Sequence, residues 1–188
     1  GEIIVTESEP RRGFHVVLSG RVKVFKASAE GKEQTVYVFG PGEPFCLCGA
    51  FGEEGHLASA AALEASRVLV LPPAGMEKLA AREPALPMAM VSLLSRRLKE
   101  SLELIESLSL KGLPGRLAAF LLQGAEESGG EAVVRLHLTH RELAKMLNAT
   151  PEALSRTLKR LADDGLVENR GREIAILDEA RLRDAARG

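Results

Sequence analysis

The chain has 188 residues and a formal net charge of −1, and 45% of its residues are hydrophobic while 27% are charged. This balance excludes a largely disordered chain, and it excludes binding to nucleic acid through overall positive charge. There is no apolar run of about 18 residues that would predict a membrane span, and no leader-like segment at Gly1. We therefore expect a cytoplasmic protein without a membrane partner, in which any contact with DNA is made by a local basic patch.

Residues 1–85 carry short apolar runs separated by turn residues. The runs cover residues 15–18, 22–25, 35–39 and 67–71, and glycine-containing turns lie between them. Many short strands at close spacing predict an antiparallel sandwich or barrel. Because residues 3–5 already read as a strand, we also expect further sequence upstream of Gly1.

A long helix is predicted over residues 86–110. Apolar residues recur there at steps of three and four, interrupted at Ser101: Val91, Leu94, Leu98, Ile105 and Leu108. A helix of about 24 residues is about 36 Å long, and no other predicted helix can cover it along its whole length. A second copy of the same helix in a parallel coiled coil is the better explanation, so we predict a dimerisation helix and a homodimer.

The C-terminal domain is predicted to span residues 111–188. Residues 111–115 interrupt the helical pattern as a hinge, and a new helix starts near Arg116 because proline and glycine suit its beginning. We expect this helix to end at the Glu-Ser-Gly-Gly segment of residues 127–130, and a short strand to follow at residues 133–138.

Two short helices joined by a tight turn are predicted from Thr139 onward. Thr139 and Glu142 have the spacing of a capping box, in which the threonine hydroxyl accepts from the third amide of the helix. Asn148 suits the turn because asparagine tolerates the left-handed backbone conformation. Thr150 then caps the second helix, with Pro151 at its first position. This layout is a helix-turn-helix.

The second of these helices has an apolar and a polar face. Leu154, Leu158 and Leu161 share one stripe, and the opposite stripe carries Glu152, Ser155, Arg156 and Lys159. In a recognition helix, a glutamate can accept from the cytosine amino group, and an arginine can bind guanine through two hydrogen bonds. Lys159, Arg160 and Arg141 are expected to meet phosphates, which position a protein without specifying sequence.

A hairpin is predicted after the second helix. Strands at residues 165–168 and 173–177 flank the Asn-Arg-Gly-Arg tip. We expect Arg170 and Arg172 to grip the DNA backbone as a wing, supplying the local positive charge that the whole chain lacks. Together with the cap residues Thr139 and Thr150, they complete the predicted interface with double-stranded DNA, and no catalytic site is expected.

Four stretches, in this order and at this spacing, resemble the Crp/Fnr superfamily of bacterial regulators: residues 17–24, 40–45, 115–122 and the recognition helix at 152–156. The resemblance implies an α+β chain with an antiparallel β-roll sensor domain (1–85), a dimerisation helix (86–110) and a winged helix-turn-helix domain (111–188). It also implies a transcription regulator, of activator type, that contacts RNA polymerase.

The resemblance does not extend to the residues that bind cyclic AMP in one branch of the superfamily. Those members hold the ribose and phosphate with a glutamate and an arginine-serine pair, and the matching positions here are Leu47, Ala58 and Ser59. The threonine-serine pair that meets adenine matches Ser101 and Leu102. A phosphate diester without its arginine loses a charge-assisted contact, so cyclic AMP is not the expected effector.

The recognition helix resembles the Fnr-type branch instead. Glu152, Ser155 and Arg156 match its Glu-x-x-Ser-Arg pattern, and the extra arginine of the cyclic-AMP branch is Pro151 here. The resemblance therefore implies a half-site like TTGAT rather than TGTGA, present in two inverted copies.

Cys46 and Cys48 leave three interpretations open for the sensor domain. We expect both to be small buried residues of the β-roll. A redox or metal role is the second interpretation, because residues at i and i+2 of a strand face the same way. The third is haem ligation by Cys46, since the haem-based carbon-monoxide sensor of the superfamily has a thiolate ligand at the matching position. The effector is thus an unknown small molecule, gas or redox signal. His15 and His56 are predicted to be surface residues.

Two other classes of protein fit the sequence less well. A cupin-like enzyme needs a metal-binding cluster of histidines and carboxylates on neighbouring strands, and the chain has no His-x-His. A cyclic-nucleotide-binding signalling adaptor without sequence-specific DNA binding would keep the phosphate-binding arginine and would need no recognition helix.

Overall fold

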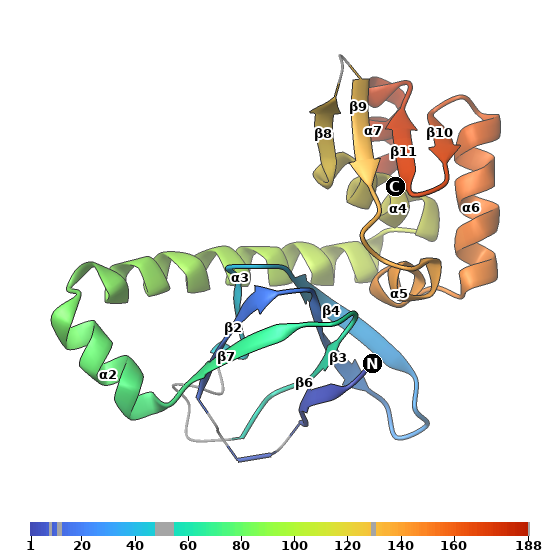
Figure 1. Cartoon of the computed structure of the whole chain (residues 1–188). Helices are drawn as coiled ribbons and strands as arrows, with labels where there is room; N and C mark the ends of the chain where they lie inside the picture. Colours follow the sequence, from blue (N-terminus) through green and yellow to red (C-terminus); the bar gives the residue numbers. More distant parts are fainter. Residues whose placement is uncertain (8, 11–12, 48–54, 129–130, 188) are drawn as a thin grey trace. The chain divides into compact units, whose positions relative to one another are not determined.

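The computed structural model describes residues 1–7, 9–10, 13–47, 55–128 and 131–187 (Figure 1). The chain forms two compact units, residues 1–95 and 96–188. Their boundary falls inside the long helix α3 (Ala85–Leu110), which the sequence analysis treated as a segment of its own. Among the described residues, no helix combines the length and the apolar character needed to cross a membrane.

The first unit is built on two antiparallel sheets, as the short apolar runs predicted. One sheet has the strand order β1-β6-β3-β4, and the other has the order β5-β2-β7. The strands are β1 (Ile3–Val5), β2 (Phe14–Ser19), β3 (Val22–Ala27), β4 (Glu33–Phe39), β5 (Pro44–Phe45), β6 (Ser59–Ala62) and β7 (Arg67–Leu71). The short strands β5 and β6 escaped the sequence analysis.

The core of this unit takes side chains from both sheets. Val17 of β2 and Val22 of β3 are fully buried, and they pack with Val5, Phe39, Phe45 and Ala60. The turn between β2 and β3 depends on Gly20, whose φ is +79° and where a Cβ would lie 2.5 Å from the carbonyl oxygen of Ala65. Glycine is therefore the residue that lets the two sheets connect here.

Helix α2 (Pro73–Arg82) and the beginning of α3 pack against the three-stranded sheet. Pro73 occupies the first turn of α2, where its missing amide costs no hydrogen bond. Phe14, Leu47 and Met76 are buried together there, and Leu86, Met90 and Leu93 of α3 pack against them. α3 itself begins within one residue of the predicted start.

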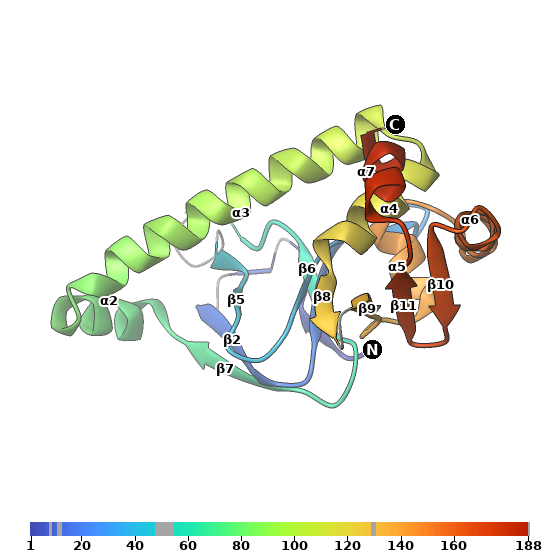
Figure 2. The same ribbon diagram turned by 90° about the horizontal axis from the view of Figure 1, so that it is seen from above.

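In the described part of the second unit, helices and an antiparallel sheet follow α3 (Figure 2). Its elements are α4 (Leu113–Gln123), β8 (Ala125–Ser128), β9 (Glu131–Arg135), α5 (His140–Met146), α6 (Pro151–Asp163), β10 (Val167–Arg170), β11 (Glu173–Ile176) and α7 (Glu179–Arg187). The sheet order is β10-β11-β9-β8, antiparallel throughout. Leu117, Leu121, Leu154, Ile174 and Leu182 are fully buried and join α4, α6, α7 and the sheet in one core.

Two predictions for this unit are wrong. The helix that begins after the hinge ends at Gln123, and residues 125–128 form β8 instead of its last turn. Pairing with β9, from Ala125 opposite Val134 to Ser128 opposite Glu131, overrides the local helical pattern. α7 was also not predicted; it begins where the amide of Arg181 donates to the Asp178 side chain at 2.9 Å.

Candidate DNA-binding interface

The first helix of the helix-turn-helix begins and ends as predicted. The Thr139 hydroxyl accepts from the Glu142 amide at 3.2 Å, so the first half of the capping box is present. After Leu147, Asn148 adopts a φ of +46°, the left-handed conformation that the turn requires. Leu143 and Ala144 are buried, which holds α5 against the core while its outer face stays exposed.

The second helix, α6, starts at a second threonine cap. The Thr150 hydroxyl accepts from the Ala153 amide at 3.2 Å, and Pro151 lies in the first turn, both as predicted. The two caps satisfy amides that a helix start otherwise leaves without a partner. The Thr150 cap therefore fixes where α6 begins, and this N-terminal end is the one that a recognition helix turns toward the bases.

The two faces of α6 are sharply divided. Leu154, Leu158 and Leu161 are at most 4% exposed. The predicted reading residues are all exposed on the other side: Glu152, Ser155, Arg156 and Lys159. Arg160 is exposed as well. Burial of the leucine stripe thus orients the polar side chains outward without any help from a ligand.

Glu152 is held ionised at the beginning of α6. The pKa of its carboxyl is lowered because the carboxylate hydrogen-bonds to its own backbone amide and to the Thr150 hydroxyl, with a further contribution from the charge of Arg156. A carboxylate can only accept hydrogen bonds. The ionised Glu152 carboxylate therefore offers an acceptor that suits an amino group on a base edge.

Several basic side chains flank this reading surface. Arg141 on α5 is exposed. On α6, Lys159 lies 3.5 Å from Asp163, and both side chains are more than 60% exposed. Such an exposed pair is weak, so Lys159 is available to a phosphate. On α5, Lys145 lies 3.3 Å from Glu142.

The wing is a tight hairpin with an arginine at its tip. β10 and β11 pair from Val167 opposite Ile176 to Arg170 opposite Glu173, leaving Gly171 and Arg172 as the turn. Gly171 has a φ of +79°, and its amide donates to the Asn169 side chain at 3.1 Å. The side chain of Arg172 is exposed at the tip.

The other wing arginine is already engaged by two carboxylates that sequence reasoning missed. Arg170 donates to Glu131 at 2.7 Å and to Glu168 at 2.6 Å. These hydrogen bonds raise the pKa of Arg170, and the same contact lowers the pKa of Glu131. Arg170 would have to leave both partners to contact a phosphate, whereas Arg172 would not. Glu131 is 39 residues away in sequence, so no local pattern could have identified it.

The residues predicted for an effector pocket do not share one environment. Leu47 is buried with Phe14 and Met76. Ser59 accepts from the Glu7 amide at 3.0 Å, and Ala58 beside it is half-buried. Cys46 is half-buried, has a φ of +56° and packs against the core of the two sheets, while Cys48 lies outside the described residues.

The prediction that His15 and His56 are surface residues is wrong. They are 1% and 4% exposed, and their rings meet edge to face with centroids 5.8 Å apart. The His15 ring also lies 5.1 Å from that of Phe45. His15 precedes the fully buried Val17 by two residues on β2, so strand alternation turns both toward the interior.

The exposed apolar face of α3 differs from the predicted heptad pattern at three positions: it includes Met88 and Leu102, and it leaves out Leu108. Leu102 is 59% exposed and continues the stripe where the prediction had an interruption at Ser101. The Ser101 hydroxyl instead donates to the Arg97 carbonyl of its own helix at 2.8 Å, and Leu108 is half-buried. The exposed stripe of α3 consists of Met88, Val91, Leu94, Leu98, Leu102 and Ile105.

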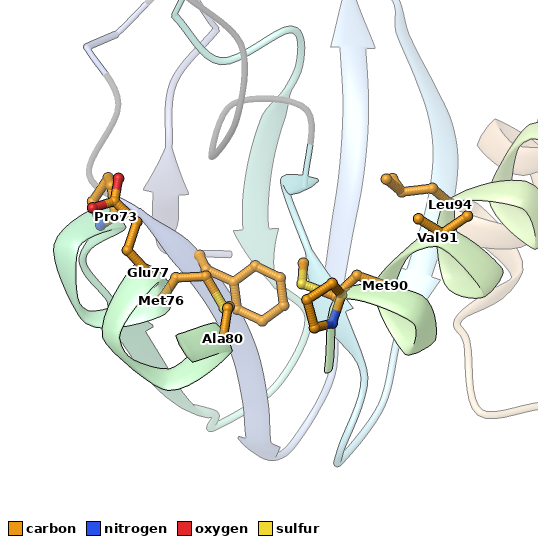
Figure 3. A pocket seen from close by; sticks show the side chains of 9 residues that line it. Pro73, Met76, Glu77, Ala80, Met90, Val91 and Leu94 are labelled. Atoms are coloured by element: carbon orange, nitrogen blue, oxygen red, sulfur yellow. The ribbon is translucent and has the colours of Figure 1, made fainter. Parts of the chain in front are cut away.

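An apolar pocket of about 310 Å³ lies between α2 and the first half of α3 (Figure 3). Met76 and Met90 contribute side chains from its two helices, and Glu77 is its one charged lining residue. Val91 and Leu94 line the pocket and also belong to the exposed stripe. Of the residues predicted to bind an effector, those that the structure describes are not among the residues that line it.

A β-roll followed by a long helix, a capped helix-turn-helix and a wing defines a transcription regulator of the sensor-and-reader type. Residues 1–83 match the cyclic nucleotide-binding domain, and residues 115–185 match the Crp-like helix-turn-helix domain. The chain belongs to the Crp/Fnr superfamily of transcription regulators, as its sequence motifs predicted.

Relatives within this superfamily match over nearly the whole chain. Electron transport regulator A of Shewanella oneidensis is 30% identical, covering 97% of this chain and 74% of the relative. The CRP-like cAMP-activated global transcriptional regulator of Mycobacterium tuberculosis is 27% identical, covering 100% of this chain and 85% of the relative. Among solved structures, a CooA mutant from Carboxydothermus hydrogenoformans is 27% identical with a TM-score of 0.86, covering 98% of this chain and 83% of that one.

Proposed function

We propose that this protein is a homodimeric transcription regulator that binds two inverted TTGAT-like half-sites in the cytoplasm and contacts RNA polymerase there. The observation that carries the proposal is the exposed row Glu152, Ser155 and Arg156 at the capped beginning of α6. Their spacing places one acceptor, one hydroxyl and one guanidinium on the face that enters the major groove.

The choice of half-site rests on the chemistry of these three side chains. Glu152 would accept from a cytosine amino group, and Arg156 would donate to the O6 and N7 atoms of guanine. The cyclic-AMP branch adds a further arginine at the position of Pro151, and proline has no donor to offer there. A TTGAT-like site is therefore favoured over TGTGA.

The proposed dimer uses the exposed stripe of α3. None of the 26 residues of α3 is buried within the chain, although six large apolar side chains lie along one face. A contiguous apolar surface of this kind is characteristic of an interface. A parallel pair of α3 helices would place the two recognition helices about 34 Å apart, the length of one DNA turn.

We further propose that the effector sensed by the β-roll is not cyclic AMP. Leu47 and Ala58 stand where the cyclic-AMP branch has a glutamate and an arginine, and Leu47 is buried in an apolar cluster. Neither side chain can form a charge-assisted hydrogen bond with a phosphate or ribose. The name of the Mycobacterium tuberculosis relative states activation by cyclic AMP. A calorimetric titration of this protein with cyclic AMP separates the two cases.

Haem is the remaining cofactor proposal. A thiolate can ligate haem iron, but Cys46 is half-buried against the core cluster between the two sheets and its side chain would have to leave that cluster. The described residues thus favour a structural role for Cys46. Titration of the protein with haem tests this directly, because a Soret shift that Cys46→Ala abolishes would establish ligation and contradict the structural role.

A fluorescence-anisotropy titration tests the DNA-binding proposal. Labelled duplexes should carry inverted TTGAT half-sites, inverted TGTGA half-sites or random sequence, at one fixed salt concentration because affinity depends strongly on salt. We expect the TTGAT duplex to bind at least about a thousandfold more tightly than random DNA. Equal affinity for all three duplexes would exclude sequence-specific regulation and favour an adaptor role.

A further inference from the structure

Arg116 connects two helix ends in the second unit. It lies in the first turn of α4, and its Nε donates to the carbonyl oxygen of Leu147 at 2.9 Å. Its Nη1 donates to the carbonyl oxygen of Lys111 at 2.6 Å. Lys111 directly follows the last residue of α3, and Leu147 is the C-cap of α5. One half-buried side chain therefore bridges the long helix and the helix-turn-helix.

The chemistry of this contact suits arginine in particular. Carbonyl groups at the C-terminal ends of helices lack partners within the helix and carry partial negative charge. A guanidinium is always charged and has donors that point in several fixed directions, so it can serve two carbonyls at once. The base of the side chain is also held firmly, because Leu117, Ala118 and Leu121 of α4 are fully buried.

We propose that Arg116 is a positioning residue that sets which spacing between half-sites the dimer accepts. The inference rests on the dimer and the half-sites proposed above. Lys111 and Gly112 lie outside both α3 and α4, and their backbone hydrogen bonds tie them to the ends of these two helices, from the Lys111 amide to Ser107 and from the Arg116 amide to Gly112. The Arg116 side chain is the contact that ties this junction to the helix-turn-helix. The Arg116 contacts hold the end of α3 at a fixed angle to the helix-turn-helix, and in the dimer that angle determines where each α6 points.

The length of the DNA spacer between the two half-sites must match the angle at which the dimer holds its two α6 helices. One added base pair moves the two half-sites apart by about 3.4 Å and rotates them by about 35°. If the Arg116 contacts fix the junction, the two α6 helices cannot adjust to the new spacing. If these contacts are lost, the helices can adjust. Selectivity for one spacer should therefore depend on Arg116 even though the residue acts through the junction and not through the bases.

The experiment measures the affinity of wild-type, Arg116→Lys and Arg116→Gln dimers for TTGAT repeats whose spacers differ in steps of one base pair. We expect the wild type to prefer its best spacer by about tenfold over the neighbouring lengths, and both variants to discriminate by less than about threefold. Arg183→Gln is the matched control, because Arg183 is an exposed arginine of α7 that pairs with Glu179 of its own helix. The control should keep the wild-type preference.

Amide hydrogen exchange in the DNA-free dimer supplies a readout that does not depend on the half-site. The Lys111 amide donates to Ser107 at the end of α3, and the Ala149 amide donates to Ala144 at the turn of the helix-turn-helix. Both should exchange faster in the Arg116 variants than in Arg183→Gln.

Wild-type exchange at both amides would overturn the proposal, and so would faster exchange with an unchanged spacer preference, since the contact then only stabilises the fold. If the wild type itself does not prefer TTGAT repeats, the proposed function fails. In that case the exchange rates alone still show whether Arg116 fixes the junction between α3 and the helix-turn-helix.

Discussion

The Thr150 hydroxyl serves both the backbone and the reading surface of α6: it accepts from the Ala153 amide at 3.2 Å, and its interaction with the Glu152 carboxylate helps to lower the pKa of that carboxyl. Folding and recognition are therefore linked at the first turn of this helix. Thr150→Ala should lower the free energy of unfolding by about 1 kcal/mol, the usual cost of losing an N-cap. It should also weaken binding to TTGAT, because the Glu152 side chain loses a fixed partner.

Urea unfolding and anisotropy titrations measure these two effects. Thr157→Ala removes the same hydroxyl and methyl groups from the middle of α6, where no cap is lost, and serves as the control. The linkage would be refuted if Thr150→Ala were no more destabilised than Thr157→Ala and bound TTGAT equally well.

Replacement of Glu152 by glutamine should reduce specificity more than affinity. Loss of one good base contact lowers discrimination against an altered half-site by about 1–3 kcal/mol. Binding to random DNA should rise slightly, because a negative charge near the phosphates is removed.

Lys159→Gln is the counterpart of Glu152→Gln: it should weaken binding to all duplexes alike and reduce the slope of log affinity against log salt by about 0.9. A uniform loss in Glu152→Gln would mean that Glu152 does not read a base.

Specificity should be insensitive to mild acid. The hydrogen bonds to the Glu152 amide and to Thr150 lower the pKa of this carboxyl. A lowered pKa means that the ionised form is lost only as the pH falls below the ordinary glutamate value of about 4.3. The affinity ratio between a TTGAT repeat and a repeat altered at the cytosine of the complementary strand should thus stay constant from about pH 8 to about pH 5.5. If this ratio fell between about pH 8 and about pH 5.5, a group that titrates in that pH range, and not Glu152, would distinguish the two repeats.

The two wing arginines should behave differently. Arg172→Gln removes an exposed cation from the wing tip and should reduce the salt slope by about 0.9. Arg170 is bound by Glu131 and Glu168, so Arg170→Gln should change the slope less. Anisotropy titrations over a range of salt concentrations give both slopes. The assignment is wrong if Arg170→Gln produces the larger change.

A charge placed in the exposed stripe of α3 should dissociate the proposed dimer. Leu98 is 63% exposed at the middle of the stripe, and Leu98→Glu would place two like charges opposite each other in a parallel pair. Analytical ultracentrifugation should then give the mass of one chain, and binding to inverted repeats should be lost. Arg96→Glu changes an exposed position on the opposite side of the same helix and should remain dimeric. If the Leu98→Glu variant remained a dimer, the exposed stripe of α3 would not be the dimer interface.

The sequence predicted those parts of the molecule that local chemistry determines. Thr139, Asn148 and Thr150 identify the helix-turn-helix because caps and left-handed turns depend on residues a few positions apart. The same holds for the wing tip at Gly171. The polar face of α6 follows from the leucine spacing alone, so the candidate reading residues could be named before the structure.

Several of the failures come from contacts between residues that are distant in the sequence. Residues 125–128 become a strand because β9 supplies hydrogen-bond partners that a helical pattern does not reveal. His15 is buried because the rings of Phe45 and His56, 30 and 41 positions further along the chain, lie against it, and its position near a glycine turn wrongly suggested the surface. The carboxylates that hold Arg170 and the carbonyls that hold Arg116 likewise meet them only after folding.

The length of α3 has a mechanical consequence. Its 26 residues extend without a break over about 39 Å, and its two ends belong to different compact units. A helix of this length acts as a lever, so a tilt of about 5° at one end displaces the other end by about 3.4 Å, the rise of one base pair. A small change of angle at one end of α3 is therefore enough to shift its other end by a whole base-pair step.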